Sequence, residues 1–351
     1  MLRDLVNHMD QTKFDITVET VWPCDPSKYL VPGIRYKAMF ASESRVNRLR
    51  YRAEAATGLA YRLHIRGDYD IECAYLEMGS TKIMASSTNK NAKKLAWVHC
   101  DLSMAVGDPE AFAAKTASRY ARFDRVVCVS QNVKERFDEL FRRRFDSVVL
   151  YNVIDDEAIR EKSRQPLPKG IKKRRLTVLS VGRFTRPKKF IRLLQAHKRL
   201  LKEGIEHDVW LLGDGPDRPM LEQFVEENGL GDSVYMPGFI ENPYPFMREA
   251  DLLACSSIYE GYSTFMTEGV ILGKPIVTTD VSGMRELLGD SEFGLIVGND
   301  DEEFCQGLKR MLMDAGIREQ YEKAAASRSR DFSAHALTQA TERFFEELID
   351  Q

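Results

Sequence analysis

Short apolar runs rich in β-branched residues alternate with longer amphipathic segments along the whole chain. In the first half the runs are DITVET (15–20), IRYKAMF (34–40), DIECAYLE (70–77), KKLAWVH (93–99), DRVVCVS (124–130) and SVVLYN (147–152). The alternation restarts with LTVLSVGR (176–183), DVWLLGD (208–214), SVYMPGF (233–239), DLLACSS (251–257) and PIVTTD (275–280). This pattern predicts an α/β protein with parallel, doubly wound sheets.

A break in this pattern predicts two domains. The stretch KSRQPLPKGIKKRR (162–175) combines two prolines, a glycine and a run of bases without apolar periodicity, which is typical of a linker. We therefore expect a first domain over 1–165 and a second over 166–332. Residues 333–351 contain an amphipathic helical pattern, and we expect this helix to cross back to the first domain.

Charge and cysteine content narrow the class of protein only slightly. Residues 1–165 carry 27 Lys and Arg against 23 Asp and Glu, so the first half is mildly basic. Ordinary solvated surface and a face that meets an anionic membrane or acceptor both remain open, whereas nucleic acid is not indicated. The six cysteines are scattered without a C-x-x-C pair, which favours reduced thiols in a cytoplasmic protein. No apolar run approaches the ~18 residues of a membrane span.

Two carboxylates flank a predicted helix start in IYEGYSTFMTEGVIL (258–272). Ligands of parallel sheets bind beyond the carboxyl ends of strands, and Glu260 follows such a strand. We expect Ser263 to cap a helix whose amides near Thr264 and Phe265 bind phosphate. Glu268 lies about one turn into that helix. Because a carboxylate accepts two hydrogen bonds from a vicinal diol, the segment predicts a sugar-nucleotide site.

A second loop, SVGRFTRPKKF (180–190), supplies cations. Gly182 ends a predicted strand, Arg183 follows it, and Lys188 stands before the next helix. Fixed cations stabilise the negative charge that develops on a leaving diphosphate, so these two side chains can serve without a metal. Gly-Asp-Gly-Pro at 213–216 is a further strand end, although it is also a generic turn.

These segments, with WVHCDLS, VSQNVKERF and LYNVID in the first half, resemble the retaining glycosyltransferases of family 4, especially bacterial enzymes of surface-polysaccharide assembly. The resemblance implies the GT-B fold, with two Rossmann-like domains facing a cleft. It implies that Glu268 holds the donor ribose, that Glu260 faces the transferred hexose, and that Arg183 and Lys188 bind the diphosphate. It further assigns phosphate contacts to Gly261, Tyr262, Ser263, Thr264 and Phe265, and the nucleobase pocket to the strand end at Pro237, Gly238, Phe239 and Ile240.

Position and resemblance together make His99 the catalytic candidate of the first domain, near the acceptor and the reacting sugar, although a lone histidine is more often structural. Asp101 can equally cap a helix. Asp68 and Asp70 form a D-x-D spacing that holds divalent metals in the other large glycosyltransferase fold, but nothing else resembles that fold. We expect no metal site and no cofactor.

The resemblance implies a retaining, metal-independent transfer of a hexose-type sugar from a UDP- or GDP-sugar to a glycan or lipid-linked acceptor. The expected location is cytoplasmic or peripheral at the inner membrane face, with weak membrane contact through the first domain. In the usual scheme the leaving phosphate takes the acceptor proton, so no base is assigned.

The chain departs from the family in two places. Lys189 stands where a glycine is common, so the backbone approach to the diphosphate is in question. The chain also begins within the family's first helix, without the opening strand and glycine-rich loop. We therefore expect the natural active protein to be longer by roughly 15 to 25 residues. An N-terminally truncated or inactive sugar-nucleotide-binding protein, or an epimerase of related fold, is the alternative.

Overall fold

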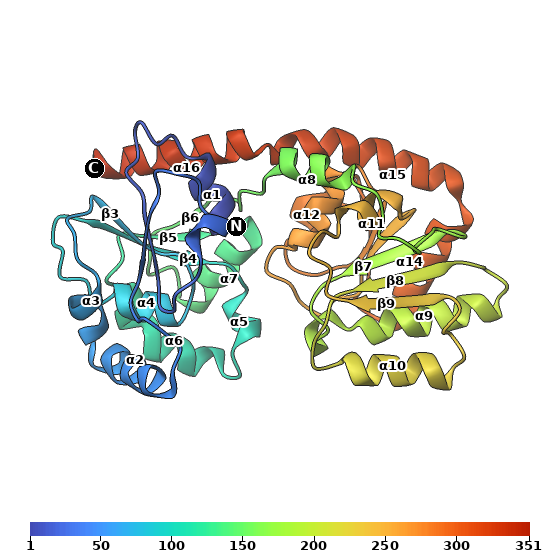
Figure 1. Cartoon of the computed structure of the whole chain (residues 1–351), viewed down its shortest axis with the longest axis horizontal. Coiled ribbons are helices and arrows are strands. Elements are labelled where there is room, and N and C mark those ends of the chain that lie inside the picture. The colour runs from blue at the N-terminus through green and yellow to red at the C-terminus, as the bar shows by residue number, and fades with distance from the viewer. The chain divides into compact units, whose positions relative to one another are not determined.

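The computed structural model describes all 351 residues, which form two compact units (Figure 1). The first unit comprises Met1–Ile154 and Ala334–Gln351, and the second comprises Asp155–Ser333. The boundary expected at residue 165 is therefore displaced by eleven residues. Asp155 caps helix α8 (Asp156–Ser163), which buries Ile159 and packs on two helices of the second unit, so these residues belong to it.

The first unit contains two separate parallel sheets. Its elements are α1 (Leu2–His8), β1 (Thr17–Thr20), η1 (Pro26–Lys28), β2 (Arg35–Ala38), α2 (Arg45–Thr57), α3 (Leu59–His64), β3 (Ile71–Ala74), α4 (Gly79–Met84), β4 (Lys93–Val98), α5 (Leu102–Ala105), α6 (Pro109–Tyr120), β5 (Arg125–Cys128), α7 (Gln131–Leu140), β6 (Ser147–Val149) and α16 (Ala334–Ile349). Strands β1 and β2 pair with each other, and the other four follow the order β3-β4-β5-β6. The two sheets of this unit are separate, since no strand hydrogen-bonds to both β1 and β3.

The second unit holds one six-stranded parallel sheet in the order β12-β11-β10-β7-β8-β9. Its elements are β7 (Thr177–Val181), η2 (Arg186–Lys188), α9 (Phe190–Lys202), β8 (Asp208–Leu212), α10 (Arg218–Glu227), β9 (Val234–Gly238), α11 (Tyr244–Glu249), β10 (Leu252–Cys255), α12 (Thr264–Ile271), β11 (Ile276–Thr279), α13 (Met284–Leu288), β12 (Leu295–Val297), α14 (Asp301–Met313), α15 (Ala315–Arg328) and η3 (Ser329–Phe332). Helices α9 and α10 lie on one side of the sheet, with α11 and α12 on the other (Figure 1). The predicted α/β class with two Rossmann-like units is thus confirmed.

Burial explains why the strands read as continuous apolar runs. Every residue of β8, β10 and β11 is buried, because helices cover both faces of the sheet. Helix α9 contributes Leu193, Leu194 and Leu200 to the same core. This packing fixes the strand ends and thereby the loops that follow them.

Two further findings concern the whole chain. All six cysteines are free thiols. None of the helices combines the length and the apolar composition needed to cross a membrane.

Candidate functional site

The predicted donor residues gather where the strand order of the second unit reverses. Strands β7 and β10 are hydrogen-bonded neighbours, although three helices and two strands separate them in sequence. Such a reversal leaves a crevice beyond the carboxyl ends of the strands. The loop after β7 carries Gly182, Arg183 and Lys188, and the loop after β10 carries Glu260.

Lys188 and Glu260 form a direct ion pair. The distance from Lys188 Nζ to Glu260 Oε1 is 2.5 Å, and Ser257 Oγ donates to the same oxygen at 2.6 Å. The Glu260 side chain is only 9% exposed, whereas that of Lys188 is 29% exposed. A buried carboxylate thus orients a more exposed ammonium group, whose two remaining protons are available to a ligand.

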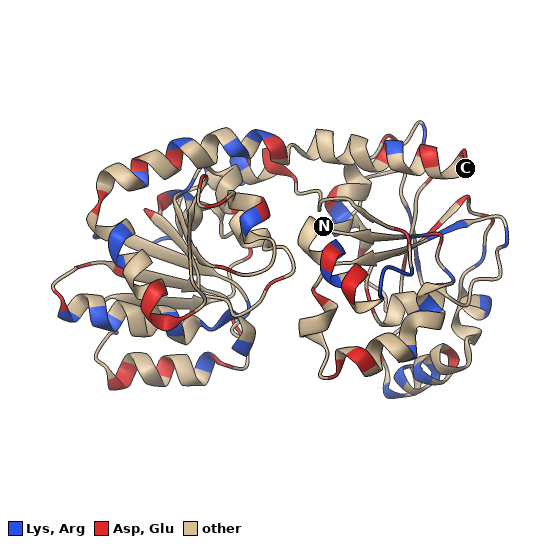
Figure 2. Cartoon of the chain, turned by 180° about the vertical axis from the view of Figure 1, so that it is seen from behind, with Lys and Arg blue, Asp and Glu red and all other residues tan.

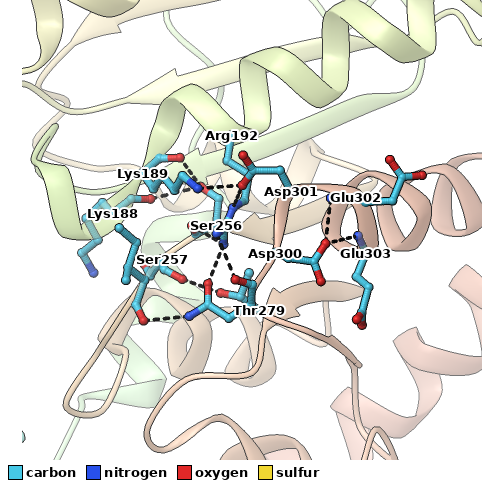
Figure 3. A network of polar contacts seen from close by, with 12 residues as sticks. Lys188, Lys189, Arg192, Ser256, Ser257, Thr279, Asp300, Asp301, Glu302 and Glu303 are labelled. Atoms are coloured by element: carbon cyan, nitrogen blue, oxygen red, sulfur yellow. Dashed lines mark hydrogen bonds and ion pairs between the residues drawn. The ribbon is translucent and has the colours of Figure 1, made fainter.

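A network centred on Arg192 holds these two loops together (Figure 3). The guanidinium is 3% exposed, donates to the backbone oxygen of Ser256 at 3.2 Å, and also binds Asn299 and Asp301. Ser256 Oγ in turn donates to the backbone oxygens of Lys188 and Lys189 at 3.1 Å. The segment that carries Lys188 is therefore bound directly by Ser256, and Arg192 links Ser256 to Asn299 and Asp301.

Lys189 occupies a backbone conformation that normally favours glycine. Its φ is +45° and its ψ is +46°, in the left-handed region. The side chain compensates by binding Asp301 Oδ1 at 2.7 Å. The departure from the family's glycine thus leaves the backbone turn intact, at the expense of local strain.

The Gly-Asp-Gly turn has a steric role beyond that of a generic turn. Gly213 has a φ of +140°, and a Cβ there would lie 1.9 Å from the backbone oxygen of Gly182. A Cβ on Gly215 would lie 2.3 Å from the backbone oxygen of Phe184. Only glycines permit this close approach of the two loops.

Glu268 lies on α12, the helix that begins with the predicted phosphate-binding amides. Tyr244 Oη donates to Glu268 Oε1 at 3.1 Å. Ser263 is the N-cap residue, as expected, but its side chain makes no capping hydrogen bond. The amides of the first turn, at Thr264 and Phe265, are therefore left without a side-chain cap.

Two other predicted donor contacts are exposed. Phe239, which follows β9, is 76% exposed although it is aromatic. Gly238 before it has a φ of +93°, which turns the chain out of the strand. Arg183 is exposed and forms no ion pair, in contrast to Lys188. Both side chains are accessible to a ligand.

His99 in the first unit is held by residues that the sequence reasoning missed. Its Nε2 lies 2.8 Å from the backbone oxygen of Tyr75, and the two rings are 4.9 Å apart. The Glu77 carboxylate accepts the backbone N–H groups of His99 and Cys100. The rule that chemistry follows strand ends would have found Glu77, since it lies just after β3.

The surroundings of His99 define its tautomer. A carbonyl oxygen only accepts, so Nε2 carries the proton and Nδ1 of the neutral ring has a free lone pair. Nδ1 is buried and has no hydrogen-bond partner. Burial lowers the pKa of His99, which favours this neutral form. The arrangement can accept a hydrogen bond from a hydroxyl group.

The remaining acidic candidates have no built site. Asp101 accepts the Ser103 amide at 2.9 Å and caps α5, which matches the structural alternative. Asp68 and Asp70 are exposed. No group of three or more His, Cys, Asp or Glu side chains that could hold a metal ion is found. Two surface hollows of the second unit, one beside Lys173 and Lys274 and one beside Asp280 and Arg285, are not lined by the predicted donor residues.

Known structures share the fold of this chain. The solved structure of Anabaena Alr3699/HepE in complex with UDP and glucose has a TM-score of 0.75 and 17% identity, and covers 98% of this chain and 94% of its own. Sucrose-phosphate synthase from Thermosynechococcus elongatus gives a TM-score of 0.79 at 17% identity, covering 99% and 92%. The chain therefore has the two-domain architecture of GT-B proteins.

Residues 160–328 match the family model described as "Glycosyl transferases group 1". This match lies within the second unit and agrees with the predicted resemblance in that part of the chain.

Curated relatives carry the same family signal. An N-acetylgalactosamine-N,N'-diacetylbacillosaminyl-diphospho-undecaprenol 4-alpha-N-acetylgalactosaminyltransferase of Campylobacter jejuni is 37% identical over 186 residues, 52% of this chain and 49% of the relative. The lipopolysaccharide core biosynthesis glycosyltransferase LpsD of Rhizobium meliloti is 28% identical over 223 residues, 63% of each. The chain spans about half to two thirds of the length of these curated relatives.

Proposed function

We propose that this chain transfers a hexose-type sugar, with retention of configuration and without a metal, from a nucleoside diphosphate sugar to a glycan or lipid-linked acceptor. The observation that carries the proposal is the Lys188–Glu260 pair at the carboxyl ends of β7 and β10. It lies within the group 1 segment, and it combines a fixed cation with a buried carboxylate. A leaving diphosphate and the sugar it releases require these two groups side by side.

The donor's diphosphate binds Lys188, Arg183 and the uncapped amides of α12. Lys188 Nζ can keep its hydrogen bond to Glu260 while it donates to a phosphate oxygen, because an ammonium group has three protons. Charge grows on that oxygen as the glycosidic bond breaks, so the cation contributes more to the transition state than to the ground state. The half-buried loop of Lys188 supports this role better than the free side chain of Arg183.

The nucleoside of the donor binds Glu268 on α12 and Phe239 after β9. Glu268 accepts the ribose hydroxyls, and the exposed ring of Phe239 covers one face of the base. Glu260 accepts a hydroxyl of the transferred sugar. The UDP bound in the Anabaena structure makes UDP the first donor nucleotide to test.

Retention is supported by the names of the relatives. The Campylobacter relative is a 4-alpha-N-acetylgalactosaminyltransferase, and an alpha-D-kanosaminyltransferase of Streptomyces kanamyceticus is 31% identical over 152 residues. Nucleoside diphosphate hexoses commonly carry an α linkage, so an α product corresponds to retention. The leaving phosphate then takes the acceptor proton, and the chain needs no dedicated base.

The first unit contributes His99 to the acceptor side. Its buried Nδ1 lone pair suits a hydrogen bond from a sugar or acceptor hydroxyl. The relatives' names include a diphospho-undecaprenol and a lipopolysaccharide core, and these support a glycan or lipid-linked acceptor. A peripheral contact with the inner face of the membrane accompanies such an acceptor.

Incubation with labelled UDP- and GDP-sugars in the presence of a chelator tests the proposal. Release or transfer of the sugar with chelator present is the expected result. Conversion of the donor to its epimer would favour the epimerase alternative, and tight binding without any release would favour an inactive binding protein. Nothing in the comparisons favours either alternative. Activity lost in chelator and restored by manganese would contradict the metal-independent reading.

A further inference from the structure

Helix α2 of the first unit presents an apolar stripe to solvent. Glu54 and Ala55 are its buried residues, with Tyr51 partly buried on the same side. At 100° per residue, Val46, Leu49 and Ala53 fall on the opposite side of the helix. Val46 is 73% exposed and Leu49 is 66% exposed, among the highest values of any large apolar side chain in the chain. This stripe packs against nothing in the structure.

Arginines flank the stripe on both sides. Arg45, Arg48 and Arg52 lie along one flank by the same helical spacing, and Arg50 lies along the other. Arg45 and Arg52 form no ion pair, Arg48 reaches the exposed Glu43 at 3.1 Å, and Arg50 binds Glu54. Residues 45–66 contain six arginines and one acidic residue, Glu54. In Figure 2 the ribbon of α2, the lowest helix of the first unit, is coloured blue for Lys and Arg at several positions.

The neighbouring helix α3 extends the same character. Leu59 and Leu63 are 43% and 44% exposed, and Arg62 and Arg66 are exposed beside them in sequence. Helix α3 packs against α2 after a turn at Gly58, whose φ is +74°. The two helices together expose four large apolar side chains and four arginines that are not paired with Glu54, and Arg66 follows α3.

We propose that α2, with α3, docks the first unit on an anionic lipid bilayer. An apolar stripe flanked by arginines matches the interface of a bilayer, where apolar side chains enter the acyl boundary and guanidinium groups bind phosphate headgroups. This inference goes beyond sugar transfer and rests on the α2 surface alone. It also places the membrane contact that the proposed function leaves unassigned.

The charge on α2 argues against the other occupants of such a surface. A second copy of the chain would bring a second row of arginines against the first, and like charges repel. A stable protein interface needs about 1,000 Å² or more of buried area, and two short helices with four large exposed apolar side chains offer less. A bilayer needs only a few inserted side chains together with electrostatic attraction.

Vesicle flotation of the full chain tests the proposal without any donor present. Parent protein should bind vesicles of phosphatidylglycerol and phosphatidylcholine at low salt, and bind pure phosphatidylcholine at least roughly tenfold more weakly. Added salt should weaken binding, since the headgroup contacts are screened. Absence of binding to anionic vesicles at low salt would overturn the proposal.

Matched variants locate the contact. R45E/R52E should lower the partition coefficient roughly a hundredfold, and L49E roughly tenfold or more, while thermal unfolding stays near the parent value because these side chains are exposed. The control variant R142E/R144E changes the net charge by the same amount at exposed arginines of the turn after α7. It should lower the partition coefficient only a few-fold. Equal losses in both double variants would mean diffuse attraction and contradict docking through α2. A dimer of the parent that L49E converts to a monomer would assign the stripe to a second copy and likewise overturn it.

Discussion

The surroundings of Lys188 and of His99 are held in different ways. Lys188 is fixed by contacts from loops that are far apart in sequence, through Arg192, Ser256 and Asp301. His99 is fixed by a single nearby segment, since Tyr75 and Glu77 supply its ring and backbone contacts. The candidate site of the second unit is thus held by hydrogen bonds between several loops. The position of His99 in the first unit depends on the single segment that carries Tyr75 and Glu77.

This difference predicts where a single substitution propagates. A change in the hub of the second unit should disturb stability and the site together, because several loops share one buried guanidinium. A change beside His99 should leave most of the first unit intact.

Arg192→Ala should cause the largest loss of stability. It leaves the buried carbonyl oxygen of Ser256 without this donor and removes the bonds to Asn299 and Asp301, at a cost of about 3 kcal/mol or more. Arg199→Ala on the same helix is the control, because its pairs with Glu203 and Glu302 are exposed and should contribute little to stability. Urea unfolding of both variants measures the difference. Equal losses in the free energy of unfolding for the two variants would contradict a central structural role of Arg192.

Lys188→Ala should lower turnover about 10² to 10³-fold, since loss of one preorganised donor costs about 2.7 to 4 kcal/mol in the transition state. The effect should fall on kcat more than on KM. Arg183→Ala, which removes a free and exposed cation, should cost only about tenfold. Steady-state kinetics with labelled donor provides the measurement, and a larger loss for Arg183→Ala would reverse the assignment.

The buried His197–His207 pair should make the second unit sensitive to acid. Its ring nitrogens lie 2.9 Å apart, and burial lowers the pKa of His197 to about 3. Burial also lowers the pKa of His207. Because the folded state holds these rings neutral, their stability contribution is complete above the unfolded pKa near 6.5 and is lost as the pH falls toward 3.

His197 alone should therefore lower the free energy of unfolding by about 2 kcal/mol between pH 6.5 and 5.0, at about 1.4 kcal/mol per pH unit. Urea unfolding at pH 7.5, 6.5 and 5.0 checks this, with His197→Gln as the variant expected to show a shallower slope. A parent protein whose stability is constant over this range would refute it.

Glu77→Ala should lower transfer about tenfold, because the backbone at His99 loses the acceptor that fixes it. Glu77→Gln should stay within about threefold of the parent, since its amide oxygen still accepts the same N–H groups. Both variants should unfold at nearly the parent temperature. If glutamine is as damaging as alanine, the carboxylate charge acts in catalysis directly.

The fold could be predicted to the extent that it depends on local pattern. All the apolar runs form strands. Those of β8, β10 and β11 are nearly continuous because helices cover both faces of their sheet, whereas β2 is partly exposed. The division of the first sheet could not be predicted, since pairing between β1 and β3 is a non-local choice. Helix α8 could not be predicted from the sequence, because its eight residues are mostly polar and precede a basic stretch without apolar periodicity.

The candidate site shows the same limit. Lys188 and Glu260 were found because they follow strands. Arg192 was missed, since a basic residue on a helix ordinarily faces solvent; its position inside the apolar run FIRLL was the available signal. The expected opening strand and glycine-rich loop rest on the resemblance alone, and that expectation stays a prediction.

A double-mutant cycle on Lys188 and Glu260 tests the central claim most directly. Turnover of labelled donor is compared for the parent, Lys188→Met, Glu260→Gln and the double variant. Because the two groups are 2.5 Å apart and act on one donor, the double variant should lose about as much turnover as the worse single variant, on the order of a hundredfold. Losses that multiply to about 10⁴-fold, or single variants with parent turnover, would contradict a donor site built on this pair.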